Sequence, residues 1–450
     1  MKDKTVYILG AGASKAANLP VQNELLDYIF SLEPPKNDFD QDLFSSPIDS
    51  QKELINNIYE QFDSRRLNIG IFIIDSFANL EDREKFQIEL QTIDKLSDPS
   101  SIEHTNELES IEELKYKILT KVYRKIIGLK INLEDIFTLF DNIAAGRENF
   151  KYYNQEKLNR LHEDLKFCII YILSYLKNNN CKLDTYKSFA KRLINQKEVN
   201  KQKDDVFSII SLNWDNILES EIYKECLNFN INKTNNNQKV LPDYCFYDYP
   251  YKQDDNHIPS TNIKAKGFKN IKFLKLHGSI NWLECPICGR IFIDNQREIA
   301  IESCIEQQCP HCSMNSKQTY DSTLRNIIIT PTFMKSLDNL HIKNIWHNAF
   351  LELSEATKVV FIGYSFPNAD FEMRCLLKKS LSSDTKIEVV LHQSDNPVGI
   401  KNMLSSRLSS SECDSILNKI DFPENRYKSF FGDQNINFIY SGFEDFIKTI

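Results

Sequence analysis

Four cysteines occur as two C-x-x-C pairs, and this spacing is typical of a metal site. About 20 residues separate the pairs, as in ribbon-type structural zinc sites: Cys285 and Cys288, then Cys309 and Cys312. Four thiolates close a tetrahedral site and leave no position for water, so the zinc would be structural. A redox function would require a thioredoxin-like helix N-terminus, which the flanking sequence lacks. His311 or Cys304 remains an alternative for one of the four ligands.

A second chemical signal is the turn at residues 10–14 (GAGAS), which follows the apolar run 6–9. A strand that ends in a Gly-x-Gly turn, followed here by a helical pattern from about Lys15, can deliver a phosphate to the helix N-terminus. There the backbone amides and the helix dipole favour negative charge. The third glycine of the dinucleotide fingerprint is missing, with Ala16 and Ala17 near its place. The turn therefore fits phosphate binding, and it also fits an ordinary tight turn between strand and helix.

Small or polar residues directly follow several other strand-like runs. They are Asn213 and Asp215, His277, Gly363 and Ser365, and His392. Ligands of open α/β sheets bind at the carboxyl ends of the strands, so these positions are candidates for a site. Each also has a structural explanation: Asn213 or Asp215 could cap a helix, and His277 could be an ordinary structural histidine.

The elements that must position these residues alternate between strands and helices. The predicted strands are 206–212, 271–276, 327–329, 359–362, 387–391 and 438–440, and the predicted helices include 337–355, 369–381 and 442–447. This pattern, with the first strand at the N-terminus, predicts an α/β fold with a Rossmann-like, doubly wound parallel sheet. Residues 228–270 are Asn-rich and poorly periodic, which predicts a long surface connection.

A large all-helical insertion is predicted between the first strand and the rest of the sheet, because the apolar period is helical almost throughout 51–196. Within it, Asn132 is expected to cap a helix whose first turn carries Glu134 and Asp135. Adjacent helical residues point in different directions, so a capping role is favoured over an acid/base pair for these two carboxylates. We predict a nucleotide-binding domain formed by 1–35 and 200–450, an insertion at 36–199, and a zinc module at 283–314.

The bulk composition is that of a globular protein with ample core. Of 450 residues, 41% are apolar and 26% are charged, and the net charge of −8 argues against a chain built mainly to bind nucleic acid. No apolar run reaches membrane-spanning length, and no secretory signal is predicted. The eleven cysteines are unlikely as a disulfide framework, so a reducing cytoplasm is expected.

In their order and placement, these stretches resemble the core of the sirtuins, a family of NAD-dependent proteins. The resemblance rests on the glycine turn, Asn213-x-Asp215, His277-Gly278-Ser279, the four cysteines and Gly363-Tyr364-Ser365. It implies that NAD is the ligand, with its pyrophosphate at Gly10, Ala11, Gly12 and Ser14, and with Pro20 in the same set. It further implies that Gly363 and Ser365 approach the phosphates or ribose, and that His392 or Gln393 lies near the adenosine ribose. Asn213 and Asp215 would line the nicotinamide-ribose pocket, and His277 would be the catalytic base.

Two departures from the deacylating sirtuins shift the expected activity. Those proteins follow the glycine turn with a Gly-Ile-Pro-x-Phe-Arg loop over the nicotinamide site, whereas Asn18–Gln22 keeps only the proline. Residues 329–335 replace the segment that builds the acyl-peptide groove. Both changes resemble bacterial sirtuin-like proteins that hydrolyse NAD to nicotinamide and ADP-ribose in anti-phage defence, with water in place of acyl-lysine. The expected function is therefore an NAD glycohydrolase.

The chemistry of that reaction suits these residue types. Nicotinamide departs through an oxocarbenium-like transition state, so preorganised polarity matters more than a strong acid. An Asn can orient a water or the ribose hydroxyls, and a neutral His can accept a proton near pH 7.

The resemblance also implies regulation by assembly. Such effectors are activated as homo-oligomers, with a DNA-translocase ATPase or with an Argonaute-like protein, and this chain carries no Walker P-loop of its own. The insertion could be an assembly surface or serve packing alone. No membrane association and no direct nucleic-acid binding are predicted. Two alternatives stay open: an NAD-dependent protein deacylase or ADP-ribosyltransferase, and a non-catalytic sensor of NAD or ADP-ribose.

Overall fold

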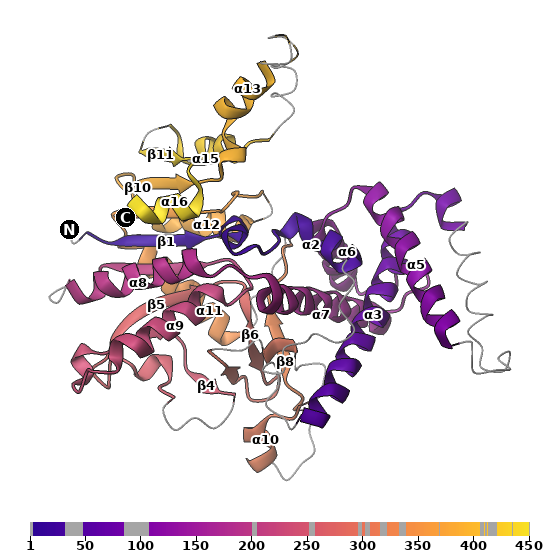
Figure 1. Ribbon diagram of the computed structural model, residues 1–450, viewed down its shortest axis with the longest axis horizontal. Coiled ribbons are helices and arrows are strands. Elements are labelled where there is room, and N and C mark those ends of the chain that lie inside the picture. Colours follow the sequence, from indigo (N-terminus) through magenta and orange to yellow (C-terminus); the bar gives the residue numbers. More distant parts are fainter. Residues whose placement is uncertain are drawn as a thin grey trace. The chain divides into compact units, whose positions relative to one another are not determined.

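The computed structural model contains two compact units (Figure 1). The first, called the sheet unit, comprises Met1–Val21 and Leu176–Ile450, and the second, called the helical unit, comprises Gln22–Tyr175. The structure describes residues 3–31, 48–84, 108–199, 205–251, 257–295, 299–301, 307–315, 322–332, 339–368, 370–405, 409, 412, 421–433 and 435–449.

A seven-stranded sheet forms the centre of the sheet unit. Its order is β11-β10-β9-β1-β2-β5-β3, and neighbouring strands pair in parallel. The central strands are short apolar runs with almost no exposed surface, as expected where helices cover both faces. The strands are β1 (Thr5–Leu9), β2 (Phe207–Ser211), β3 (Val240–Asp243), β5 (Lys269–Lys275), β9 (Lys358–Ile362), β10 (Lys386–Val390) and β11 (Ile436–Ile439).

The strand order reverses at β1, because β2 and β5 extend the sheet on one side and β9, β10 and β11 on the other. In open α/β sheets this reversal creates a crevice at the carboxyl ends of the strands. The longer helices of this unit are α8 (Asp184–Val199), α9 (Ile217–Asn230), α11 (Leu340–Ser354), α12 (Phe371–Ser380), α13 (Pro397–Ser405), α15 (Pro423–Phe431) and α16 (Gly442–Thr449). Helix α8 packs on α9 and α16, and α11 packs on α12.

A second, four-stranded sheet contains β6, the strand that follows β5 in the chain. It comprises β4 (Asp248–Pro250), β6 (Gly278–Glu284), β7 (Ile291–Ile293) and β8 (Arg325–Ile328), in the order β4-β7-β6-β8. Strand β6 is antiparallel to both β7 and β8. The short helix α10 (Pro310–Asn315) contains Cys312, and Cys309 directly precedes it. A small core of Leu283, Phe292, Ile299 and Leu324 packs around Cys285 and Cys309.

The helical unit contains α2 (Leu25–Ser31), α3 (Ile48–Phe77), α5 (Leu108–Leu129), α6 (Leu133–Gly146) and most of α7 (Gln155–Asn180). Its core includes stacked aromatic pairs such as Phe62 with Tyr171, whose ring centroids lie 4.1 Å apart. The predicted start of α6 is confirmed: Asn132 accepts a hydrogen bond from Asp135 N–H, and the Asp135 carboxylate accepts one from Asn132 N–H. This reciprocal pair is a capping box, so Asp135 has a structural role.

The doubly wound parallel sheet predicted from the sequence is confirmed, and two local predictions are wrong. The helix after the glycine turn, α1 (Ala11–Ser14), begins at Ala11 and not at Lys15, because Ala13 N–H already bonds to Gly10 O at 2.9 Å. Residues 228–270 are more than a surface connection, since they include β3 and β4. The Asn230 side chain bonds both backbone groups of Val240, so asparagine serves here to hold a strand.

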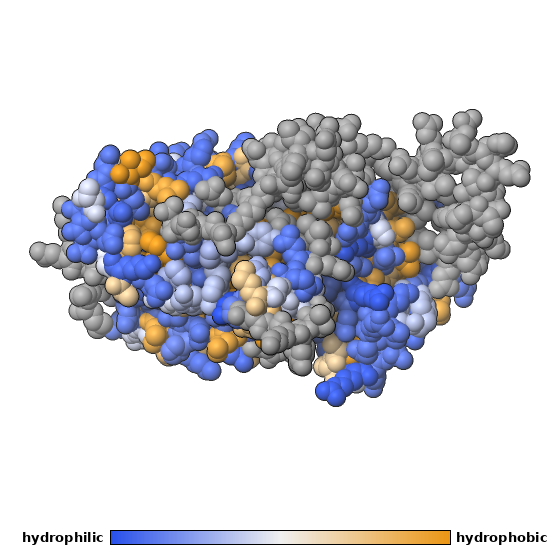
Figure 2. All heavy atoms as spheres, turned by 90° about the horizontal axis from the view of Figure 1, so that it is seen from below, coloured by the Kyte–Doolittle hydropathy of each residue, from blue (hydrophilic) through white to orange (hydrophobic). Residues whose placement is uncertain are grey.

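The surface of the described residues is mixed. On the face shown in Figure 2, apolar residues are scattered among hydrophilic ones. Large apolar side chains such as Met314 and Phe371 are exposed singly, as is common on globular proteins. Among the described residues, no helix is long and apolar enough to cross a membrane.

Candidate functional site

Four of the residues singled out from the sequence lie at the carboxyl ends of three adjacent strands. Ser14 follows β1, Asn213 and Asp215 follow β2, and His277 follows β5. All four are buried, with 3–8% of their surface exposed. The parallel sheet therefore brings together side chains that are far apart in the chain.

Three of these side chains form one hydrogen-bonded row. Asn213 Nδ2 donates to Ser14 Oγ at 3.0 Å, and Ser14 Oγ donates to Asp215 Oδ2 at 2.7 Å. Asn213 Oδ1 is buried and finds no hydrogen-bond partner among the residues that the structure describes. Leaving such an acceptor unsatisfied costs about 1–3 kcal/mol. A ligand hydroxyl or N–H would satisfy it.

The His277 ring is held by a backbone group. Its Nδ1 lies 3.1 Å from Leu212 O, and since a carbonyl oxygen only accepts hydrogen bonds, Nδ1 must carry the proton. In the neutral ring Nε2 is then the basic nitrogen. It faces Asp370, with 4.0 Å between Nε2 and Asp370 Oδ1.

Asp370 was not identified from the sequence. It precedes α12 at the N-cap position, but its side chain makes no capping hydrogen bond. Instead, Asp370 Oδ2 accepts a hydrogen bond from the Tyr364 hydroxyl at 2.8 Å. Burial and the neighbouring carboxylate raise the pKa of Tyr364 well above its usual value, so Tyr364 stays a proton donor. In the sequence, Asp370 is typical of a helix cap, and only its neighbours in space reveal another role.

A buried ion pair supports the loop that carries Asn213 and Asp215. Lys275 and Glu219 lie 2.6 Å apart and are 0% and 3% exposed. Lys275 Nζ also donates to the backbone oxygen of Asp215, and Ser279 Oγ donates to that of Trp214. Burial raises the pKa of Glu219, and Lys275 opposes this shift. Lys275 is one of three lysines in β5, so the sequence alone did not single out this pair.

The glycines of the N-terminal turn contact a second turn. Gly12 N–H donates to Gly363 O at 2.7 Å, and a Cβ at Gly12 would lie 2.6 Å from that oxygen. Gly10 has no room for a side chain because a Cβ there would lie 2.6 Å from Tyr364 Cα. Gly363 itself has a φ of +60°. Close packing of the two turns therefore explains these glycines without a bound phosphate.

The remaining predicted site residues are more widely placed. Pro20 is buried, and Ser365 is exposed directly after Tyr364. His392 is exposed beyond β10, which β9 separates from β1, and its Nδ1 lies 2.8 Å from Ser394 Oγ. The structure therefore does not bring His392 into the row formed by Ser14, Asn213 and Asp215.

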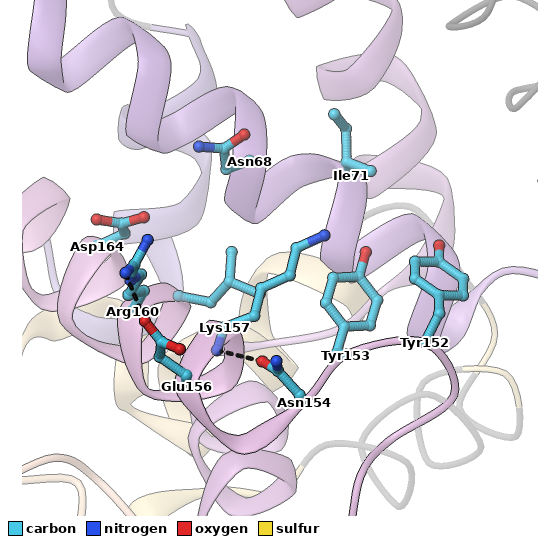
Figure 3. A pocket seen from close by; sticks show the side chains of 10 residues that line it. Asn68, Ile71, Tyr152, Tyr153, Asn154, Glu156, Lys157, Arg160 and Asp164 are labelled. Carbon is cyan, nitrogen blue, oxygen red and sulfur yellow. Dashed lines mark hydrogen bonds and ion pairs between the residues drawn. The ribbon is translucent and has the colours of Figure 1, made fainter.

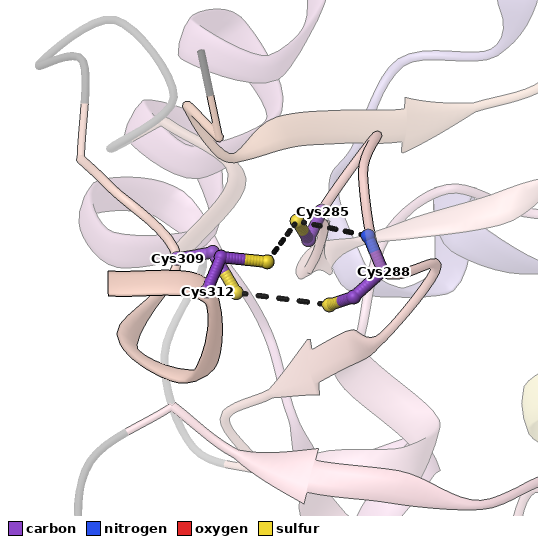
Figure 4. A group of neighbouring side chains, drawn as sticks. All are labelled: Cys285, Cys288, Cys309 and Cys312. Carbon is purple, nitrogen blue, oxygen red and sulfur yellow. Dashed lines mark hydrogen bonds between the residues drawn. The ribbon is translucent and has the colours of Figure 1, made fainter. Parts of the chain in front are cut away.

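The four cysteines converge as the spacing predicts (Figure 4). Their sulfur atoms all lie within 4.8 Å of one another, with 3.8 Å between Cys285 and Cys312 and between Cys288 and Cys309. A tetrahedral zinc with Zn–S bonds of about 2.3 Å would separate its sulfurs by about 3.8 Å. The four thiols thus fit a structural zinc. His311 contacts Arg290 instead, and Cys304 lies outside the described residues, as does Cys413.

A second group of possible metal ligands already has a cation. Asp205, Glu352 and Glu355 surround the ammonium of Lys4, at 2.7–2.8 Å. Burial lowers the pKa of Lys4, but hydrogen bonds to the three carboxylates outweigh this and raise it. The cluster lies before β1 and β2, at the end of the sheet opposite to His277, and stabilises the start of these strands.

A cavity of about 470 Å³ lies within the helical unit. Its walls come from α3, from α7 and from the loop before α7, with Tyr153 and Lys157 among the lining residues (Figure 3). Lys157 Nζ lies 4.5 Å from the Tyr153 ring centroid, and Arg160 pairs with Glu156. None of the residues singled out from the sequence lines this cavity.

Comparisons with known proteins give low similarities. No family model matches the sequence, and no curated protein matches it. Similar solved structures include a mutant Sir2 homologue with ADP-ribose, at 13% identity and a TM-score of 0.29 over 61% of this chain and 78% of that one. A Sir2 homologue–NAD complex has 13% identity and a TM-score of 0.27, and the match covers 65% of this chain and 88% of that one. A structure of Sir2 with an inhibitor, 2′-O-acetyl-ADP-ribose and a deacetylated peptide has 10% sequence identity and a TM-score of 0.31. That match covers 99% of this chain and 91% of the other. At these values the similarities do not assign the chain to a family.

Proposed function

We propose that the chain binds NAD at the carboxyl edge of its parallel sheet and hydrolyses the bond between nicotinamide and ribose. The observation that carries this proposal is the convergence of Asn213, Ser14, Asp215 and His277 on three adjacent strand ends, with Asn213 Oδ1 left for a ligand. The NAD complexes of Sir2 homologues concern those proteins, and the resemblance of the motifs suggests the same ligand here.

Each residue has a distinct part in the proposed reaction. The turn at residues 10–14 lies at the end of β1, where the pyrophosphate would approach, and the Asn213 amide would orient a ribose hydroxyl or water. The Ser14–Asp215 bond fixes that amide. His277 Nε2 takes a proton from the attacking water as neutral nicotinamide leaves, so the products are nicotinamide, ADP-ribose and one proton.

Hydrolysis suits the surroundings of His277 better than peptide deacylation. The segment in place of the acyl-peptide groove bonds directly to the site: Ile329 N–H donates to His277 O, and Trp214 Nε1 donates to Ile329 O at 3.1 Å. Thr330 and Thr332 of this segment are buried. The segment therefore packs onto the site, which favours water over a peptide substrate there. Phe333–Lys335, which belong to the same replacement, lie outside the described residues.

The test is an NAD cleavage assay with the purified chain. Nicotinamide and ADP-ribose are followed for the wild type, Asn213→Ala and His277→Ala, with NAD binding measured by calorimetry. We expect turnover in the wild type and a loss of about 10²-fold or more in each variant, the usual range for a general base. Intact NAD binding without turnover under any activating condition would favour the sensor, and turnover that requires an acylated peptide would favour the deacylase.

We further propose a cytoplasmic role in anti-phage defence through NAD depletion, switched on by assembly. The support is the motif resemblance alone. Homo-oligomers, a DNA-translocase ATPase and an Argonaute-like protein are the proposed activators. Phage challenge of cells that carry the wild type or His277→Ala tests this role: protection and a fall in cellular NAD should both require His277.

A further inference from the structure

The two polar atoms at the reacting side of His277 form a pair of acceptors. Leu212 O fixes the proton on Nδ1, so Nε2 accepts, and Asp370 Oδ1 lies 4.0 Å away from it. The other carboxylate oxygen of Asp370 is engaged by the Tyr364 hydroxyl at 2.8 Å, which aims Oδ1 at the imidazole. The two side chains are 9% and 11% exposed.

This separation matches the geometry of one bound water. A water oxygen at the usual distance of about 2.8 Å from both atoms would see them at an angle of about 90°, close to the angle between the two O–H bonds of water. Water has two protons to donate and therefore satisfies both acceptors at once. An alcohol has only one proton and satisfies one of them.

We propose that Asp370 and His277 together hold the water that attacks the ribose, which makes Asp370 a catalytic residue. This inference rests on the proposed function and names the nucleophile that the site selects. The C1′–N bond breaks first, and its electron pair leaves with nicotinamide, whose ring becomes neutral. The water oxygen then forms the bond to C1′ of the oxocarbenium ion. One water proton goes to His277 Nε2 and is then released to solvent. The second proton stays on the new hydroxyl, which donates a hydrogen bond to Asp370.

The Asp370 side chain does not cap α12, the helix that it precedes. A helix N-cap aspartate ordinarily turns its carboxylate toward the helix amides. Here no such bond forms, and α12 begins without a side-chain cap. The helix therefore lacks about 1 kcal/mol of capping stabilisation. This loss is consistent with a carboxylate that serves the site.

The test separates water attack from cleavage of the C1′–N bond. Exchange of labelled nicotinamide into NAD requires cleavage but no water, whereas ADP-ribose release requires both. In Asp370→Asn we expect ADP-ribose release to fall by about 10²-fold, the range for loss of a proton-transfer partner. Exchange should fall much less, so the ratio of exchange to hydrolysis rises at least about tenfold.

Two further variants keep the test decisive. Tyr364→Phe removes the hydrogen bond from the Tyr364 hydroxyl to Asp370 and should raise the same ratio by a smaller factor, even if Asp370→Asn does not fold. Asp384→Asn makes the same chemical change at an exposed carboxylate before β10 and should leave both rates unchanged. Equal losses of exchange and hydrolysis in Asp370→Asn would refute the inference and leave the NAD hydrolase standing. Absence of both reactions in the wild type would instead refute the proposed function.

Discussion

Replacing Lys275 by Met tests whether the buried ion pair supports the candidate site. Lys275 is fully buried and pairs with Glu219 at 2.6 Å, and its ammonium also donates to Asp215 O. The methionine has nearly the same length and fills the space, so no large cavity forms. What changes is that the Glu219 carboxylate stays buried without its cation, and the loop after β2 loses a donor.

The expected loss of stability is large. Breaking a buried pair by removing one partner costs about 3–5 kcal/mol, because the other charge remains uncompensated. The double variant Lys275→Met, Glu219→Leu removes both charges and should recover most of this loss, but not the bond to Asp215 O. The free energies of unfolding of the wild type, both single variants and the double variant form a double-mutant cycle, read from urea denaturation.

The pH dependence gives a second readout with a definite sign. Burial already raises the pKa of Glu219 above its usual 4.5, and removing Lys275 removes the main opposing influence. A carboxyl whose folded pKa is raised binds more protons in the folded state, so its stability contribution is lost as pH rises through the folded pKa. Lys275→Met should therefore be relatively more stable at pH 5 than at pH 8, compared with the wild type. A loss below about 1 kcal/mol that does not vary with pH would refute this reasoning.

Two other perturbations test the metal and the glycine turn. Removing the metal by a strong chelator, or replacing Cys288 by Ser, should unfold the small four-stranded sheet, measured as release of one zinc per chain and faster amide exchange in β6 and β7; a chain purified without zinc would contradict the assignment. Gly12→Ala places a Cβ 2.6 Å from Gly363 O, so we expect a loss of about 1–3 kcal/mol in thermal unfolding and weaker NAD binding by calorimetry, and unchanged stability would contradict the close packing of the two turns.

The sequence was most informative where one physical demand decides the residue type over a short stretch. Parallel strands buried on both faces need uninterrupted apolar runs, and the runs that form β1, β2 and β9 are visible for that reason. Thiol spacing likewise identifies the metal site. The capping box at Asn132 is equally local.

The sequence was least informative where the cause is a neighbour in space. Strand β6 was not predicted, because Ser279 and Asn281 interrupt its apolar pattern although both are fully buried and hydrogen-bonded. Asp370 is typical of a helix cap until His277 is placed beside it. The pairing of Lys275 with Glu219 requires the contact of β5 with α9, which no local pattern encodes.

The position of His277 at the junction of the two sheets links the metal to the proposed chemistry. His277 lies two residues after the end of β5, and Gly278 begins β6 with a φ of +74°, a conformation that glycine adopts without strain. A Cβ at Gly278 would clash with Ile327 O of β8, so the tight pairing of β6 with β8 depends on this glycine. Ile329, which directly follows β8, also donates its N–H to His277 O. The backbone of the candidate base is therefore held by the four-stranded sheet that contains the cysteine site. A structural metal far from the reacting atoms would in this way still determine where the imidazole stands.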